Sequence, residues 1–233
     1  MKDLKIFDTK QKLAGYFGDI LLSRLSTNNK FTIALSGGST PKAIFDVLVS
    51  QYKDKIDWNK IHLFWGDERC VGPDDAESNY KMTYDHLISK VPIPQTNIHR
   101  IKGENEIDAE AKAYEQHLKH TLPIVNGIPQ FDMVLLGMGS DGHTASIFPH
   151  QINLWDSADL CVPAWHPESG QRRISFTGKT INNAKEIFFL ITGKDKAEKL
   201  NEIINKKAGY KNYPASLVDS PVFLIDKDAG ALL

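Results

Sequence analysis

The sequence predicts an α/β protein in which helices cover both faces of an open, mostly parallel sheet. Five short runs of the chain are mostly apolar, and segments with helical spacing of apolar residues lie between them. Continuous apolar runs are typical of parallel strands that are buried on both faces. Their alternation with helices favours a sheet with a helix layer on each side.

The predicted strands, by residue number, are 31–35, 61–65, 131–136, 187–191 and 222–225. The predicted helices are 13–25, 40–49, 78–88, 108–119 and 194–204. The second helix has a start signal, because Thr40 can cap it and Pro41 suits the first helical position. The sequence contains no internal repeat, low-complexity tract or convincing linker, so we expect one domain over residues 1–233.

Composition and charge limit the classes of function. Hydrophobic residues make up 41% of the chain and charged residues 24%, which is ordinary for a globular protein. The 28 basic and 29 acidic residues leave a formal net charge of −1. Without a global basic field, nucleic acid is not an expected partner. A small anionic ligand would need a local cluster of donors.

The two cysteines and the apolar runs indicate the compartment. Cys70 and Cys161 could pair, but their spacing matches no disulfide framework, so free thiols in a reducing compartment are the simpler interpretation. The N-terminus carries charges throughout, and no apolar run approaches the length of a membrane span. We therefore expect a soluble, intracellular protein without membrane contact. The sequence leaves open whether it is a monomer or a small homo-oligomer.

Ligands of open α/β sheets bind beyond the carboxyl ends of the strands, which directs attention to four loops. The first loop, residues 36–42, contains Gly38, Ser39 and Thr40 before a predicted helix. Glycine lets the backbone approach a ligand, and the helix N-terminus offers free N–H groups, so the loop suits a phosphate or a carboxylate. A tight strand-to-helix turn is the competing interpretation. The spacing of a Walker A loop is absent.

The second loop places Asp67, Glu68 and Arg69 directly after a predicted strand. Asp67 could accept protons or hydrogen bonds from sugar hydroxyls. Arg69 could bind a carboxylate or phosphate through two parallel donors. For an isolated triplet of this kind, a solvated turn with a local ion pair is the favoured interpretation.

The third loop is rich in glycine and matches G-x-G-x-x-G at Gly137, Gly139 and Gly142. Dinucleotide binding is a poor interpretation, because Pro149 interrupts the segment where a long crossover helix should run. The acid near the expected distance, Asp159, also precedes the next apolar stretch instead of ending a strand.

A better interpretation of this loop makes Asp141 and His143 functional side chains at the working edge of the sheet. A neutral imidazole, with an ordinary pKa near ~6.5, is a suitable general base at physiological pH. The acid two residues before it could orient the ring. The competing interpretation is a loop histidine with no chemical role.

The fourth feature is a set of cations. Residues 171–175 are predicted to form a short strand that carries Arg172 and Arg173, and Lys194 follows the predicted strand 187–191. A phosphate dianion commonly needs such a collar of donors. Taken singly, each cation is more simply an exposed surface residue.

Metal and serine-nucleophile chemistry have weak support. His117 and His120 lie three residues apart on a predicted helix, but no nearby acid or cysteine completes a ligand set. The HExxH and G-x-S-x-G patterns are absent.

Taken together, these loops resemble the 6-phosphogluconolactonase family, which is related to the glucosamine-6-phosphate isomerases/deaminases. The most specific match is Gly142-His143-Thr144-Ala145-Ser146 after Asp141. The resemblance runs in order from about the first strand to the C-terminus. The matching segments are 35–41, 65–69, 78–80, 131–149, 173–175 and 213–216.

The resemblance implies a Rossmann-like three-layer α/β/α domain that works in the cytosol, in the oxidative pentose phosphate pathway, on a small phosphosugar lactone. It implies that His143 is the general base, and we group Asp141 and Asp67 with it as catalytic candidates. The residues that match substrate or phosphate ligands are Gly38, Ser39, Thr40, Arg69, Arg173 and Lys194. Glu168 departs from the family pattern, because similar proteins often have a lysine near it.

The expected chemistry is hydrolysis of the lactone without a metal or organic cofactor. His143 would take a proton from a water that attacks C1 and return it to the departing ring oxygen. Two alternatives remain open. An amino-sugar-phosphate isomerase/deaminase is disfavoured, because that branch uses an acid shortly after the histidine and residues 144–149 contain none. A non-catalytic sugar-phosphate sensor would not need His143.

Overall fold

The computed structural model describes residues 3–233 and has a seven-stranded sheet at its centre. The strand order is β1-β12-β11-β8-β2-β3-β5, and all neighbours are parallel. The strands are β1 (Asp3–Phe7), β2 (Phe31–Leu35), β3 (Ile61–Trp65), β5 (Ile98–His99), β8 (Met133–Leu136), β11 (Glu186–Ile191) and β12 (Val222–Asp226). The five strands expected from apolar runs all belong to this sheet.

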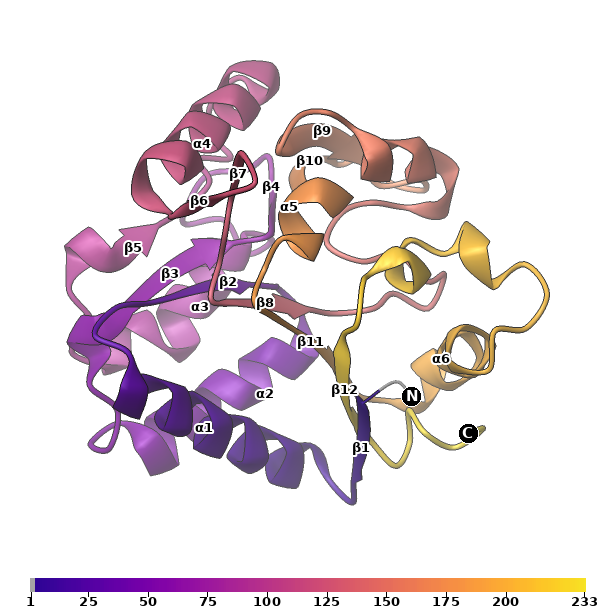
Figure 1. The fold of residues 1–233 in the computed structure, drawn as a ribbon, viewed down its shortest axis with the longest axis horizontal. Helices are drawn as coiled ribbons and strands as arrows, with labels where there is room; N and C mark the ends of the chain where they lie inside the picture. The colour runs from indigo at the N-terminus through magenta and orange to yellow at the C-terminus, as the bar shows by residue number, and fades with distance from the viewer. Residues whose placement is uncertain (1–2) are drawn as a thin grey trace.

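Helices cover the two faces of the sheet, so the expected α/β/α architecture is confirmed (Figure 1). In this view α1 and α2 lie below the sheet, whereas α4 and α5 lie above it. Helix α2 packs against both α1 and α3. The helices are α1 (Lys10–Thr27), α2 (Ser39–Val47), α3 (Asn79–His86), α4 (Ile107–Thr121), α5 (Gly178–Asn182) and α6 (Ala197–Ile204).

A second, antiparallel sheet lies above the main one and contains β4 (Asp67–Arg69), β10 (Arg172–Phe176) and β9 (Cys161–Trp165), in that order. The expected strand at 171–175 corresponds to β10. Only Gly66 separates the end of β3 from the start of β4. The chain therefore passes directly from the carboxyl end of a central strand into the small sheet. A short hairpin, β6 (Ile124–Val125) and β7 (Ile128–Pro129), completes the strands.

Burial explains why the central elements form where they do. All five residues of β2 and all four of β8 are buried. Helix α1 is capped by Thr9, whose side chain accepts from the Lys12 N–H, and it buries one stripe of apolar residues against the sheet. That stripe consists of Leu13, Ala14, Phe17, Leu21 and Leu25. The apolar stripe and the buried strands give the sheet a fixed scaffold from which the loops project.

Two expectations about helix starts are wrong. Helix α2 begins at Ser39 with Gly38 at its N-cap, so Thr40 is not the cap and Pro41 occupies the third helical position. Gly38 has a φ of 106°, a conformation that favours glycine over threonine. Residues Lys194–Lys196 form a 3-10 turn, and α6 starts only at Ala197.

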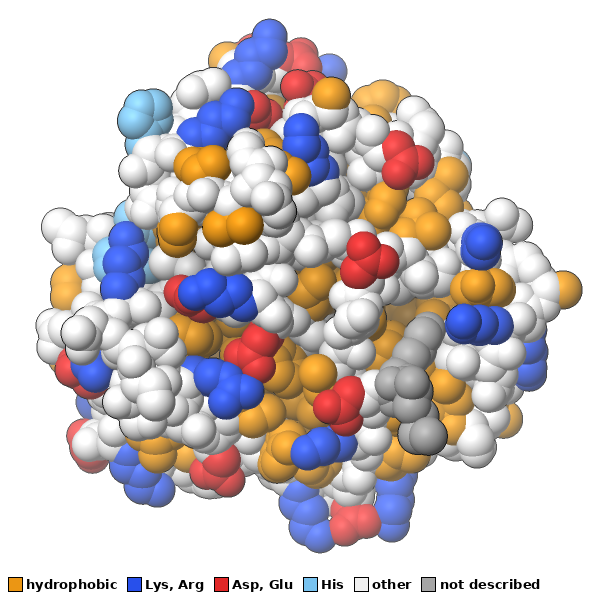
Figure 2. Space-filling model, in the orientation of Figure 1, with side chains coloured by type: hydrophobic (Ala, Val, Ile, Leu, Met, Phe, Trp, Pro, Cys, Tyr) orange, Lys and Arg blue, Asp and Glu red, His pale blue; other side chains and the backbone are white. Residues whose placement is uncertain are grey.

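The surface and the cysteines complete the description. Basic and acidic side chains are interspersed over the face seen in Figure 2, in keeping with the small net charge. Cys70 and Cys161 are both free thiols. Over residues 3–233, no helix combines the length and the apolar character that crossing a bilayer requires.

Candidate active site

A cavity of about 270 Å³ lies at the carboxyl edge of the central strands. The loops after β2, β3, β8 and β11 all contribute to its wall, which is the set of loops that the sequence singles out. Seven of the expected site residues meet there: Gly38, Ser39, Thr40, Asp67, Arg69, His143 and Arg173. Residues from four separate parts of the chain therefore face one volume.

The loop after β2 brings the N-terminus of α2 to the cavity. Gly38 adopts its left-handed φ just before the helix, and a side chain at Gly37 would lie 1.8 Å from Oδ1 of Asn79. The first N–H groups of a helix have no partner within the helix, and the helix dipole favours negative charge there. The Thr40 hydroxyl forms a 2.7 Å hydrogen bond with that of Thr192, which fixes the helix to the loop after β11.

Strand β4 divides its three residues between two faces. Asp67 and Arg69 line the cavity, whereas Glu68 is buried behind them. Glu68 accepts hydrogen bonds from the N–H of Asn79 and of Tyr80 and thereby caps the start of α3. Burial raises the pKa of Glu68, while the N–H donors act in the opposite direction. Of the two acids in the loop, only Asp67 is available to a ligand.

Arg69 and Arg173 face each other across the small sheet. They are register partners in the β4–β10 ladder, and the buried Nε of each has no hydrogen-bond partner among the described residues. Burial lowers the pKa of Arg173, the charge of Asp67 acts to raise it, and the charge of Arg69 lowers it further. Like charges placed directly opposite repel each other, so an anion between the two guanidinium groups would be stabilised.

A buried hydroxyl connects Asp67 with Arg173. The Oγ of Ser146 donates to Oδ2 of Asp67 at 2.6 Å, and Nη1 of Arg173 donates to the same Oγ at 3.4 Å. A second nitrogen of Arg173, Nη2, donates to Gln171 Oε1 at 3.0 Å. Asp67 and Arg173 are therefore held in place before any ligand arrives.

Asp141 and His143 form a hydrogen-bonded pair. Nδ1 of His143 lies 2.6 Å from Oδ1 of Asp141, and the backbone N–H of His143 donates to the same oxygen. Although burial acts to raise it, these hydrogen bonds leave the pKa of Asp141 below its ordinary value. A carboxylate at Nδ1 favours the tautomer with its proton there, which leaves the lone pair on Nε2. No residue in 3–233 forms a hydrogen bond with Nε2 of His143, and His143 lines the cavity.

The loop around the pair is tightly built. A Cβ on Gly139 would lie 2.2 Å from Nδ1 of His143, so only glycine leaves room for the ring. The Thr144 hydroxyl donates to the Gly137 carbonyl, and the Phe148 ring packs 4.5 Å from the imidazole, centroid to centroid. These contacts hold the imidazole in place, and the Asp141 carboxylate favours one tautomer.

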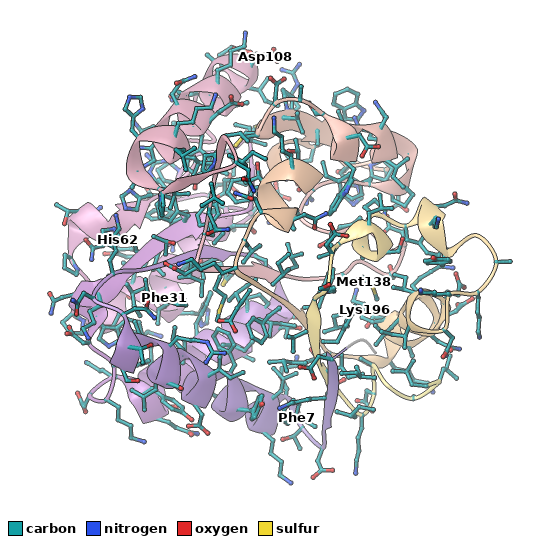
Figure 3. The ribbon with its side chains drawn as sticks, viewed as in Figure 1. Phe7, Phe31, His62, Asp108, Met138 and Lys196 are labelled. Carbon is teal, nitrogen blue, oxygen red and sulfur yellow. The ribbon has the colours of Figure 1, made fainter. Side chains whose placement is uncertain are left out.

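The lysine that the sequence predicts for a phosphate collar, Lys194, does not line the cavity. Lys194 is exposed and does not line the cavity, whereas Lys196 does. The 3-10 turn after Gly193 accounts for the difference, because it rotates the chain before α6 begins. Lys196 and Met138, which are labelled in Figure 3, both belong to the cavity wall.

Among the site residues that sequence reasoning missed are Asn79, Ser146, Thr192 and Lys196. Lys196 had only a weaker signal of the same kind, because it lies five residues after the end of β11, whereas Lys194 lies three residues after it. Asn79 and Thr192 act across long sequence separations, through bonds to the Asp67 carbonyl and the Thr40 hydroxyl. A single sequence carries no signal for such contacts.

The two histidines considered as metal ligands have other contacts. Nε2 of His117 lies 2.9 Å from Nδ1 of His99, and Nδ1 of His120 lies 2.7 Å from the Gln116 carbonyl oxygen. In the part of the chain that the structure describes, no three His, Cys, Asp or Glu side chains are grouped to hold a metal ion.

Comparison with known proteins gives consistent matches. The family model of glucosamine-6-phosphate isomerases/6-phosphogluconolactonase matches residues 7–224. A 6-phosphogluconolactonase of Haemophilus influenzae is 47% identical over 211 residues, 88% of this chain and 89% of that protein. One of Treponema pallidum is 44% identical over 198 residues, covering 85% and 82%. The solved 6-phosphogluconolactonase of Trypanosoma brucei has a TM-score of 0.85 at 28% identity, covering 100% of this chain and 99% of that one.

Proposed function

Because the chain belongs to the glucosamine-6-phosphate isomerase/6-phosphogluconolactonase family, we propose that it hydrolyses 6-phospho-D-glucono-1,5-lactone to 6-phospho-D-gluconate, with His143 as the general base. The observation that carries the proposal is the pairing of two features in one cavity. A base that Asp141 orients has no hydrogen-bond partner at Nε2 among residues 3–233, and two arginines that are opposite each other in the small sheet line the same cavity.

The first step is attack of water on C1 of the lactone. Nε2 of His143 accepts a proton from the water as the new C–O bond forms, and the electrons of the carbonyl move to its oxygen. Asp141 holds the imidazole in the tautomer with its proton on Nδ1 and stabilises the imidazolium that results. The packing of Phe148 against the ring keeps it aimed at the cavity.

The second step is collapse of the tetrahedral intermediate. The carbonyl re-forms, the bond between C1 and the ring oxygen breaks, and the imidazolium returns its proton to that oxygen. Arg69 is placed to stabilise the charge on the carbonyl oxygen, since it lines the cavity together with Asp67. Asp67 accepts hydrogen bonds from substrate hydroxyls. The balance is one water consumed and one carboxylic acid formed, which ionises at neutral pH.

The phosphate is bound away from the reacting carbon. The N-terminus of α2 at Ser39 and Thr40 supplies N–H donors and a positive dipole end, and Lys196 and Arg173 supply charge. Binding this remote group holds C1 near His143, so its binding energy contributes to turnover as well as affinity. We extend the proposal to a cytoplasmic enzyme of the oxidative pentose phosphate pathway that works as one domain, as a monomer or small homo-oligomer, without cofactor.

The test is hydrolysis of freshly generated 6-phosphoglucono-1,5-lactone, with the spontaneous rate subtracted. We expect turnover that is insensitive to EDTA and that falls sharply for unphosphorylated gluconolactone. Ammonia release from glucosamine 6-phosphate, measured in parallel, would indicate a deaminase instead. Binding of 6-phosphogluconate without any turnover would indicate a sensor. Either of these results would contradict the proposal.

A further inference from the structure

Ser146 holds a position between two opposite charges. Its hydroxyl donates to the carboxylate of Asp67 at 2.6 Å and accepts from the guanidinium of Arg173 at 3.4 Å. Its side chain is completely buried. Within residues 3–233, no ion pair joins Asp67 and Arg173 directly, although both line the same cavity. The two charged groups therefore meet through one hydroxyl oxygen.

Backbone contacts fix the position of the Ser146 hydroxyl. The N–H of Ser146 donates to the buried Oγ of Ser175 at 3.0 Å, which ties the residue to β10. The preceding Ala145 has a φ of 48°, an unfavourable backbone conformation for a residue with a side chain. Ser146 also lies on the loop that carries His143. One rigid loop thus supplies the base and the contact between Asp67 and Arg173.

Without the hydroxyl, Asp67 and Arg173 would form a different arrangement. Oδ2 of Asp67 would lose its hydrogen bond inside a buried site, which is costly for a charged group. A carboxylate and a guanidinium that are partly desolvated attract each other strongly and favour a direct pair with two parallel bonds. Such a pair would turn the donors of Arg173 and the acceptors of Asp67 toward each other and away from the cavity.

We propose that Ser146 is a positioning residue that keeps Asp67 and Arg173 apart as two separate substrate ligands. This inference rests on the proposed function, since it assigns substrate contacts to both charged residues. Ser146 itself does not contact the reacting atoms. Its effect is on ground-state binding through its two neighbours, while the pair of Asp141 and His143 is left intact.

The test compares Ser146→Ala with a matched control, Thr180→Val. The Thr180 hydroxyl is equally buried and donates to the Leu160 carbonyl at 2.7 Å, away from the cavity. We expect Ser146→Ala to raise KM for the phospholactone about tenfold and to change kcat less than about threefold. Both variants remove a buried hydrogen bond, so we expect Thr180→Val to lower Tm about as much as Ser146→Ala does. Thr180→Val should leave KM and kcat unchanged. Ser146→Cys, with a weak donor of similar shape, is the second variant and should raise KM too.

A double-mutant cycle and a structure complete the test. In an Asp67→Asn background no ion pair can form, so adding Ser146→Ala should raise KM less than about threefold further. A crystal structure of Ser146→Ala should show Asp67 and Arg173 in direct contact at about 2.8 Å. The inference would be overturned if Ser146→Ala left KM unchanged, or if the effects of Ser146→Ala and Asp67→Asn on KM were independent. It would also be overturned if Asp67 and Arg173 stayed apart in the crystal structure of Ser146→Ala. Absence of lactone turnover in the unmodified enzyme would instead overturn the proposed function.

Discussion

Arg69 and Arg173 stand opposite each other in the ladder of β4 and β10, so two guanidinium groups share one wall of the cavity. The charge of Arg69 contributes to the lowered pKa of Arg173, after the larger effect of burial. Both residues keep a buried Nε that has no partner in the described chain. A buried donor without a partner and two like charges on neighbouring strands both cost stability.

Replacing one of the two arginines should therefore weaken substrate binding without unfolding the protein. We expect Arg173→Gln to raise KM for the phospholactone about tenfold or more, because a charged donor is lost, and to leave Tm unchanged or slightly higher. Steady-state kinetics and thermal melts of the same preparation check both points. Arg100→Gln, which breaks an ion pair with Glu104 outside this cavity, is the control. A KM equal to that of the unmodified enzyme in Arg173→Gln would show that Arg173 does not bind the substrate.

Removing the charge of Asp141 tests whether it orients the base. Asp141→Asn keeps the shape but offers its amide to Nδ1 of His143, which favours the wrong tautomer. We expect kcat to fall about 10- to 100-fold, the usual cost of losing a carboxylate that holds a functional histidine, with a smaller change in KM. Asp85→Asn, in an exposed ion pair on α3, should have no effect. Equal losses in both variants would argue against the orienting role.

Gly139 provides a steric test of the same pair. A methyl group there would approach Nδ1 of His143 to 2.2 Å and Oδ1 of Asp141 to 2.5 Å, so Gly139→Ala must displace one of them. We expect kcat to fall at least about tenfold. Gly72→Ala is the matched control, because no described atom outside Gly72 and its two chain neighbours lies within 4 Å of the added carbon. Full activity in Gly139→Ala, measured with saturating lactone, would show that the geometry of the pair does not limit turnover.

A row of three histidines away from the cavity predicts a pH effect on stability. His99 lies between His62 and His117, with nitrogen separations of 3.1 and 2.9 Å. Burial, followed by the charges of His117 and His62, lowers the pKa of His99 to about 4. Since the unfolded chain has the ordinary value near ~6.5, it binds more protons between these limits, and stability is lost as pH falls from about 6.5 to about 4.

The size of this effect is measurable by thermal melts. We expect His99 to account for a loss of about 2 kcal/mol, or roughly 4–8 °C in Tm, over that range. His99→Phe removes the titrating group, and its ring can stack on Phe64 as the imidazole does. Its Tm should fall less steeply with pH than that of the unmodified protein. His120→Gln, on the exposed face of α4, should leave the slope unchanged. Identical slopes for His99→Phe and the unmodified protein would contradict the assignment.

The sequence predicts strands well where burial is complete on both faces. The bounds of β2 and β3 coincide with the apolar runs at 31–35 and 61–65. Strand β1 escaped prediction because Asp3 and Lys5 interrupt its apolar residues, as an edge position permits. Strand β9 contains Pro163, and a proline argues against a strand unless that strand lies at the edge of its sheet. The edge position of β9 is evident only in the folded structure.

The sequence also predicts part of the candidate site, whereas the rest is visible only in the folded structure. The rule that ligands bind beyond the carboxyl ends of strands was sufficient to direct attention to Asp67 and His143, which line one cavity. Arg173, which lies within β10, was predicted from its basic neighbourhood and the family resemblance instead. The displacement from Lys194 to Lys196 depends on a single 3-10 turn, which residue types do not determine. The role of Ser146 depends on contacts to residues 79 positions before it and 27 after it, and only the folded structure shows them.

The central claim is that His143 is the base in lactone hydrolysis, and kcat of His143→Asn on freshly generated 6-phosphoglucono-1,5-lactone tests it most directly. The account predicts a fall of at least about 100-fold at neutral pH, with KM and Tm close to those of the unmodified enzyme. His150→Asn serves as the matched control and should keep full activity, since His150 does not line the cavity. A folded His143→Asn variant with near-normal kcat would contradict the account.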